Sequence, residues 1–318
     1  MAEVKLIEGE TVRVSPALFP DASPGQYVLL DRGLIIELIE PEGRRQDVGS
    51  GAAGRRRRTH ELASNSITSG GLLAAERTSL TGTSRFIRYA FMPNRLRYCG
   101  GDDNRTLFEY SLENARDGDL VPMLRKFTGA LPYLRLIARA NEIADPFDER
   151  VVEAYWIGNE LLERVEVRQL YDALLERFGK QLQGRTRDWV LGKAPAGARP
   201  HHNFHVFDVH SKVGELDHTL ETMDNCRISW GKVVGLEGAE LVVERQPLLL
   251  SDGKLSLGPA ATVRAVRQVD SKGFADAAAV GDWVALHWDW VCEVLTTRQK
   301  ENLARFTDQH LTLANQTI

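Results

Sequence analysis

The stretch NCRISWGKVVGLEGAELVVE, residues 225–244, predicts a β-hairpin that begins directly after a cysteine. Apolar and polar residues alternate on both sides of Glu237-Gly238, and glycine tolerates the positive φ that a tight turn needs. Further strands are predicted in TVRAVRQV (262–269) and DWVALHWDWV (282–291). Several short strands in one segment favour a small closed barrel, because closure leaves no unpaired edge.

A helix is predicted to follow the barrel and to end the chain. Thr296 and Gln299 have the spacing of a capping box, and Leu303, Phe306 and Leu313 form an apolar stripe. Barrel and terminal helix together account for residues 226–318.

The middle of the chain, residues 85–195, predicts a helical domain. In DPFDERVVEAYWIGNELLERV (145–165), Asp145 is suited to an N-cap, Pro146 to the first helical position, and apolar residues recur at helical spacing. Gly179 is expected to end the next helix, whose apolar residues include Leu170 and Leu174.

The remaining segments differ in composition. Residues 1–42 predict strands, residues 43–84 are rich in Gly, Ser and Arg and predict a flexible linker, and residues 196–225 connect the helices to the barrel. The fold class expected is therefore α+β multidomain.

Composition restricts the function. The 318-residue chain has a net charge of −4, which argues against a general nucleic-acid binder, and no apolar run is long enough to cross a membrane. The N-terminus has no signal-peptide pattern, so a cytoplasmic location is expected, with three cysteines as reduced thiols. Phosphate-loop, dinucleotide and Gly-x-Ser-x-Gly motifs do not occur, so no nucleotide cofactor is expected.

The segment CRISWGKVVGLEGAELVVE, followed by VGDWVALHWDWVCEVLT, resembles the HypC/HupF family of [NiFe]-hydrogenase maturation chaperones over about residues 226–305. Those proteins are small OB-like barrels in which a cysteine, helped by a histidine, presents iron and contacts the scaffold HypD. The resemblance implies these roles for Cys226 and His287, and implies partner contacts by Trp230 and Lys232. Trp230 replaces the family's proline, and the internal Cys226 has no free α-amino group beside it.

Two weaker resemblances concern the rest of the chain. GQYVLLDRGLIIELIE (25–40) aligns without gaps on GDWVALHWDWVCEVLT (281–296), with four identities and with Asp31 in place of the histidine. It is either half of a degenerate second barrel or a chance similarity between two β-rich segments. The middle, with RYAFMPNRLRYCGGDD (88–103), looks like an actinobacterial family of unknown function.

The histidine-rich HHNFHVFDVH (201–210) is a second candidate metal site. As a strand it places His202, Asp208 and His210 on one face and His205 on the other, whereas a helix places His201 and His205 one turn apart. Hydrogen bonding of these histidines to the backbone is the alternative.

The loop YCGGDD (98–103) offers a thiol, Cys99, and the carboxylate of Asp102. A turn and helix cap are the stronger explanation for Asp102 and Asp103, whereas the role of Cys99 stays open.

These patterns lead to one principal hypothesis and two alternatives. The first is an accessory or maturation chaperone for [NiFe] hydrogenase, a binding rather than catalytic protein, which holds iron or another transition metal. Its expected partner is a HypD-type scaffold or the hydrogenase large-subunit precursor. The alternatives are a metalloenzyme with its site at residues 202–210, and an interaction protein that has lost metal binding. The linker also allows pairing between chains as a homo-oligomer.

Overall fold

The computed structural model describes residues 80–317, except 116–117, 181–182 and 211–218, together with four strands before residue 40. The chain divides into two compact units, Met1–Thr78 and Ser79–Ile318. Most of the predicted linker, residues 43–84, lies outside the described residues.

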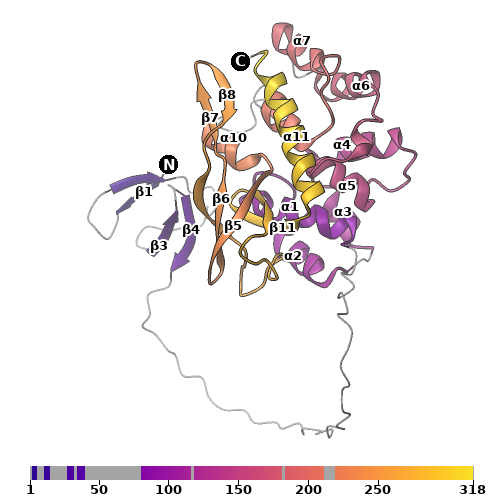
Figure 1. Ribbon diagram of the computed structural model, residues 1–318. Helices are drawn as coiled ribbons and strands as arrows, with labels where there is room; N and C mark the ends of the chain where they lie inside the picture. The colour runs from indigo at the N-terminus through magenta and orange to yellow at the C-terminus, as the bar shows by residue number, and fades with distance from the viewer. Residues whose placement is uncertain are drawn as a thin grey trace, which may run out of the picture. The chain divides into compact units, whose positions relative to one another are not determined.

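The second unit is mixed α and β, as predicted (Figure 1). Its helices are α1 (Gly82–Arg95), α2 (Asn104–Glu113), α3 (Leu120–Leu124), α4 (Leu131–Ala140), α5 (Glu149–Trp156), η1 (Glu160–Leu162), α6 (Val167–Phe178), α7 (Gly184–Gly192), α8 (His202–Phe204), η2 (His205–His210), α10 (Leu220–Cys226) and α11 (Thr297–Ala314). Its strands are β5 (Ser229–Glu237), β6 (Glu240–Arg245), β7 (Leu248–Ser251), β8 (Lys254–Leu257), β9 (Ala261–Val266), β10 (Trp283–His287) and β11 (Trp290–Leu295). Within the described residues, no helix is both long and apolar enough to cross a membrane.

Five strands close into the predicted barrel in the order β5-β6-β9-β11-β10 and back to β5. Every pairing is antiparallel except that of β9 with β11. This strand order, with its one parallel pair, is that of an OB-like Greek-key barrel. The predicted hairpin is confirmed, since Glu237 pairs with Glu240 and Gly238 between them has a φ of +60°.

The segment predicted as one strand, DWVALHWDWV, is instead a hairpin. Strands β10 and β11 are joined by Trp288 and Asp289, whose φ values of +53° and +56° form a two-residue turn. Apolar and polar residues alternate from Leu286 to Trp290, through the turn itself, so the sequence pattern alone does not reveal the turn. His287 consequently lies at the very end of β10, directly before the turn.

The helix predicted over residues 145–165 is also interrupted. Helix α5 begins later, with Asp148 as its N-cap, while Asp145 accepts a hydrogen bond from the Phe147 amide in the preceding turn. The helix ends before Gly158, which has a φ of +96°. A Cβ atom at Gly158 would lie 2.1 Å from the Phe306 ring of α11, so the close packing of α11 requires glycine and breaks the helix.

Gly158→Ala is expected to lower the free energy of unfolding by about 3 kcal/mol, because it combines a left-handed backbone with overpacking against Phe306. Urea denaturation measures this change. Gly192→Ala is the matched control, since a Cβ at Gly192 would meet no atom within 4 Å and should change stability by less than about 0.5 kcal/mol. Equal effects of the two substitutions would contradict the packing argument.

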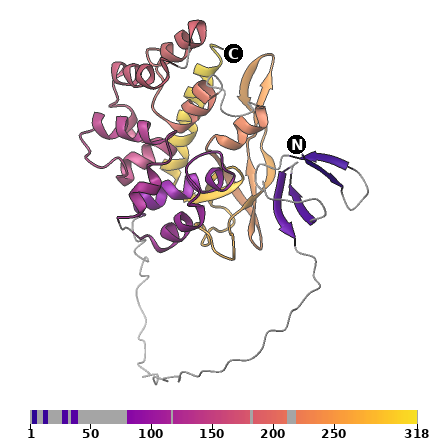
Figure 2. The ribbon, with the colours of Figure 1, turned by 180° about the vertical axis from the view of Figure 1, so that it is seen from behind.

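The helices and the barrel, expected as separate domains, share one hydrophobic cluster where they meet, while the barrel also has an interior cluster of its own. Phe91 of α1 packs on Trp290 of β11 with ring centroids 4.8 Å apart, and Phe108 of α2 packs on Phe274 at 5.1 Å. The capped terminal helix α11 lies beside the barrel and buries Leu303, Phe306 and Leu313 (Figures 1 and 2). Helical and barrel residues therefore stabilise one another.

The first unit contains two hairpins, formed by β1 (Ala2–Lys5) with β2 (Thr11–Val14) and by β3 (Tyr27–Asp31) with β4 (Leu34–Ile39). The register of β3 and β4 repeats that of β10 and β11, pair for pair, at an offset of 256 residues, with the bulge at the same place. Asp31 pairs with Leu34 as His287 pairs with Trp290. The two hairpins form separate two-stranded sheets, so half of a second, degenerate barrel stays a prediction beside chance similarity.

Candidate metal centre

Three side chains from distant parts of the chain meet where the helices contact the barrel. The ligand atoms of His202, Cys226 and His287 all lie within 4.8 Å of one another. His202 begins α8, Cys226 ends α10, and His287 ends β10. The structure thus places Cys226 beside His287 and adds His202 to the pair.

The hydrogen bonding of His287 fixes which of its ring nitrogens is available. Nδ1 lies 2.6 Å from the backbone oxygen of Tyr89 in α1, and a carbonyl only accepts, so Nδ1 carries the proton. Nε2 is then an unprotonated acceptor, and it is buried without a hydrogen-bond partner. The side chain is only 2% exposed. A ring held through Nδ1 with a free Nε2 is how proteins present a histidine to a metal.

His202 is held by its neighbour Asn203, whose side chain bonds both backbone groups of Ile228 just after Cys226. One ring nitrogen of His202, Nε2, lies 2.9 Å from the Cys226 carbonyl, and the other, Nδ1, lies 3.2 Å from the Tyr155 hydroxyl. If Nε2 turned from the carbonyl to a metal, Nδ1 would carry the proton and its N–H would donate a hydrogen bond to the Tyr155 hydroxyl oxygen. A ligating histidine usually donates a hydrogen bond in this way through its second ring nitrogen.

Cys226 is fixed by the anchoring of α10 to the barrel. Asp224 accepts hydrogen bonds from Arg227, Arg245 and the Leu248 amide, at 2.9 to 3.1 Å. The buried Arg227, paired with Asp224, has a pKa lowered to about 10, chiefly by burial. Unlike the two histidines, Cys226 is partly exposed as a residue, although its thiol is buried beside them.

Burial sets the protonation of the cluster. It lowers the pKa of His287 to about 4 and the pKa of His202 well below its usual value, so both rings are neutral at neutral pH. It raises the pKa of the Cys226 thiol to about 12, an effect that the nearby Trp288 indole partly offsets. Two neutral imidazoles and one thiol that loses its proton on binding form a donor set suited to zinc, ferrous iron or nickel.

The strand conformation predicted for the second candidate metal site is wrong. Residues 202–210 are helical, with the π-helix η2 after α8, so the strand that would align His202, Asp208 and His210 is absent from this described segment. His205 contacts the Tyr133 hydroxyl at 3.2 Å, and Asp208 pairs with Lys193 at 2.8 Å. The side chain of His210 lies outside the described residues.

The helical alternative, with His201 and His205 one turn apart, has its two rings in different surroundings. The His201 ring stacks on Phe306 and on His310 of α11, each with centroids 5.5 Å apart, while His205 turns to Tyr133. His201 and its neighbours therefore belong to the packing of α11.

The other predicted residues lie around the cluster or apart from it. Cys99 is half-buried and packs against the main core, and Asp102 is exposed. Asp103 precedes α2 without capping it and pairs instead with Lys126 at 2.5 Å. On β5, Trp230 is half-buried and Lys232 is exposed.

Sequence reasoning missed the residues that orient the ligands. The Tyr89 carbonyl, the Tyr155 hydroxyl and the Trp156 ring, whose centroid lies 4.7 Å from that of His202, all come from the helical part of the chain. The one sequence signal for these residues was the adjacent aromatic pair Tyr155-Trp156 in α5. Adjacent residues of a helix point in different directions, so the pair indicates that a second face of α5 is also buried.

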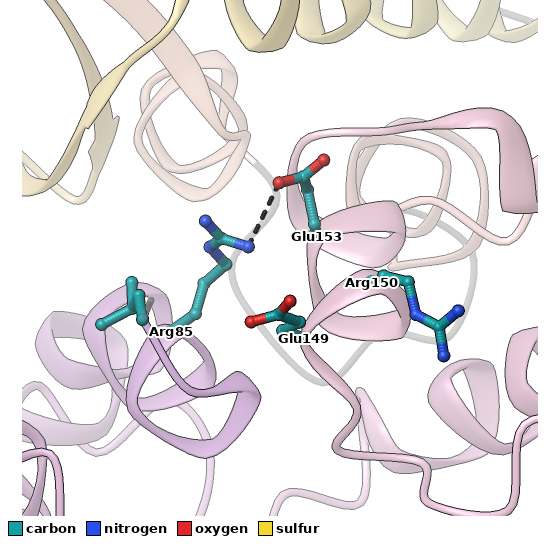
Figure 3. Close-up of a pocket in the computed structure, with 5 residues that line it drawn as sticks. Arg85, Glu149, Arg150 and Glu153 are labelled. Atoms are coloured by element: carbon teal, nitrogen blue, oxygen red, sulfur yellow. Dashed lines mark ion pairs between the residues drawn. The ribbon is translucent and has the colours of Figure 1, made fainter. Parts of the chain in front are cut away.

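A separate pocket of about 170 Å³ lies between α1 and α5, lined by Leu80, Arg85, Glu149, Arg150 and Glu153 (Figure 3). Arg85 pairs with Glu153 at 3.1 Å and with the buried Glu293 at 3.2 Å. Glu293 also accepts a hydrogen bond from Tyr89 at 2.9 Å. These ion pairs compensate the charge of Arg85. The group of Arg85, Glu153 and Glu293 therefore joins α1 and α5 to β11 and does not offer a binding group.

One family model matches this chain, over residues 78–318, and its description is "Family of unknown function (DUF6390)". The chain belongs to the DUF6390 family. The match begins at the boundary of the second compact unit and covers its helices and its barrel together. No match was found among curated proteins or among solved structures. The DUF6390 match thus contains all three residues of the candidate centre.

Proposed function

We propose that this DUF6390 protein binds a transition-metal ion through Cys226, His202 and His287, as an accessory or maturation protein for [NiFe] hydrogenase. The observation that carries the proposal is His287: its Nδ1 is fixed by the Tyr89 carbonyl, and its buried Nε2 faces the cluster without a partner. An unsatisfied buried polar atom costs about 1–3 kcal/mol. A bound metal removes that cost.

The surroundings favour holding a metal over catalysis at it. Among the described residues, the grouped ligands are two neutral histidines and one cysteine, with no carboxylate among them to act as a general base. Aromatic rings contact the two histidines, and Cys226 completes the group of ligands beside them. Such a site is suited to holding a metal fragment.

Iron is the favoured metal, and a HypD-type scaffold or the hydrogenase large-subunit precursor is the favoured partner. Both follow from the resemblance of residues 226–305 to the HypC/HupF chaperones, in which matching cysteine and histidine positions do this work. Strand β5, which begins three residues after Cys226, carries Trp230 and the exposed Lys232, the two further residues proposed to contact the partner.

Metal binding is expected to be equimolar in the wild-type protein and to be lost in Cys226→Ala. Anaerobic titration with Fe²⁺, followed by gel filtration and metal analysis, measures the stoichiometry. Cys292→Ala is the matched control, because Cys292 is buried in the core with its sulfur 3.6 Å from the Trp290 oxygen. Full binding by Cys226→Ala, or none by wild type, would contradict the proposed site.

The partner role is tested separately by co-purification with a HypD-type scaffold. Capture by wild type and by Cys292→Ala, with loss of capture in Cys226→Ala, is the expected result. Equal capture of all three proteins would show that the cysteine does not mediate the interaction.

A further inference from the structure

We propose that Cys99 is a fourth ligand, and that it completes a Cys₂His₂ site when the metal binds. This inference rests on the proposed function, because it assigns a further residue to the same centre. It changes the expected site from a three-ligand arrangement to a tetrahedral one with four protein ligands, the arrangement in which proteins hold a metal rather than react at it.

The first argument is the position of the loop that carries Cys99. Its neighbour Tyr98 stacks on Trp288, with ring centroids 4.3 Å apart and planes at 20°. The Trp288 amide in turn donates to the Asn225 oxygen at 2.8 Å. Tyr98, Trp288 and Asn225 are the sequence neighbours of Cys99, His287 and Cys226, respectively. Their contacts therefore bring these three parts of the backbone near one another.

The second argument is that the loop backbone is fixed in place. The buried amide of Asn94 donates to the oxygens of Cys99 and Gly101, at 2.8 and 2.7 Å. Gly100 between them has a φ of +83°, and a Cβ there would lie 2.6 Å from the Phe127 ring. Gly100 is thus required by close packing, and the loop that carries Cys99 is held in place by Asn94 of α1.

Coordination requires a movement of the Cys99 side chain. Three ligand atoms lie within 4.8 Å of one another, and the Cys99 sulfur is not one of them. Because the loop backbone is held by Asn94, rotation about the Cα–Cβ bond is the available motion. Each thiol that binds the ion forms a sulfur–metal bond and releases its proton to solvent, so two protons leave for each divalent ion bound.

Titration with Co²⁺ tests the assignment, because the near-ultraviolet thiolate-to-cobalt absorption scales with the number of bound sulfurs. Wild type and Cys292→Ala are expected to show the intensity of two thiolates, and Cys99→Ser about half of it. Full wild-type intensity in Cys99→Ser overturns the inference but leaves the proposed function intact, provided that Cys226→Ser loses intensity. No cobalt binding by wild type overturns both.

Alkylation of the unmodified chain gives a second readout that does not depend on the folding of a variant. With Co²⁺ present, iodoacetamide labelling of Cys99 and Cys226 should fall at least tenfold, as measured by peptide mass spectrometry, and removal of the ion by a chelator should restore it. Protection of Cys226 alone would show that Cys99 is not a ligand.

Discussion

Lowering the pH from 7.5 to 5 is expected to unfold the metal-free protein. Four fully buried histidines have lowered pKa values because burial disfavours their charged form: His201 to about 3, His287 to about 4, and His202 and His310 well below the usual 6.5. They remain neutral in the folded chain at a pH where the unfolded chain takes up protons.

The direction of the effect follows from proton linkage. A histidine whose folded pKa is depressed contributes its full stability above 6.5, and that stability is lost as the pH falls toward the folded value. Each buried histidine removes about 1.4 kcal/mol per pH unit over this range. At pH 5 the four together remove about 8 kcal/mol, which is comparable to the whole stability of a typical domain.

Urea denaturation in the presence of a chelator, at several pH values between 7.5 and 5, measures the loss. His310→Gln is the informative variant, because His310 accepts a hydrogen bond from the Arg199 amide through Nε2 and glutamine retains an acceptor. This substitution should reduce the pH dependence by about a quarter, in proportion to one histidine in four. A free energy of unfolding that stays constant down to pH 5 would show that these rings gain protons without unfolding.

Asp208→Asn is expected to lower the free energy of unfolding by about 3–5 kcal/mol, because it leaves the Lys193 ammonium buried without its counter-charge. The side chains of Lys193 and Asp208 are 3% and 1% exposed, and their charged atoms lie 2.8 Å apart. Lys193 also donates to the Leu313 oxygen near the end of α11, so the pair fixes the terminal helix to the segment that carries His202.

The double substitution Lys193→Met with Asp208→Leu is the control, because removing both charges together should recover most of the lost stability. Denaturant unfolding of the single and double variants measures the difference. The folded fraction of Asp208→Asn should bind metal with wild-type stoichiometry. Loss of metal from folded Asp208→Asn, with unchanged stability, would restore the metal site predicted at residues 202–210.

The parts of the fold that were predictable from the sequence have local causes. The hairpin at residues 225–244 follows from alternation around a glycine turn, and the terminal helix from a capping box that forms as expected between Thr296 and Gln299. The break at Gly158 and the turn at Trp288 were not predictable, since the first is imposed by Phe306 and the second interrupts a continuous apolar alternation.

The candidate site was predictable only in part, because its geometry depends on contacts between residues far apart in the sequence. The resemblance of residues 226–305 to a known family paired Cys226 with His287. The histidine density of residues 201–210 predicted His202 as a ligand, but the strand pattern grouped it with Asp208 and His210. That grouping requires a strand, and the segment is helical. The place of His202 depends on Asn203, which bonds to Ile228 25 residues further along the chain, and periodicity does not report such a contact.

The candidate ligands belong to segments that begin far apart in the sequence, at α8, α10 and β10. An ion held by all of them would act as a cross-link between the helical layer and the barrel. The unfolded chain cannot keep that cross-link, because His287 is 61 positions from Cys226. Metal binding at the site would therefore raise the melting temperature of the protein with the logarithm of the free metal concentration. Delivery of the ion to a client would correspondingly lower the stability of the protein that released it.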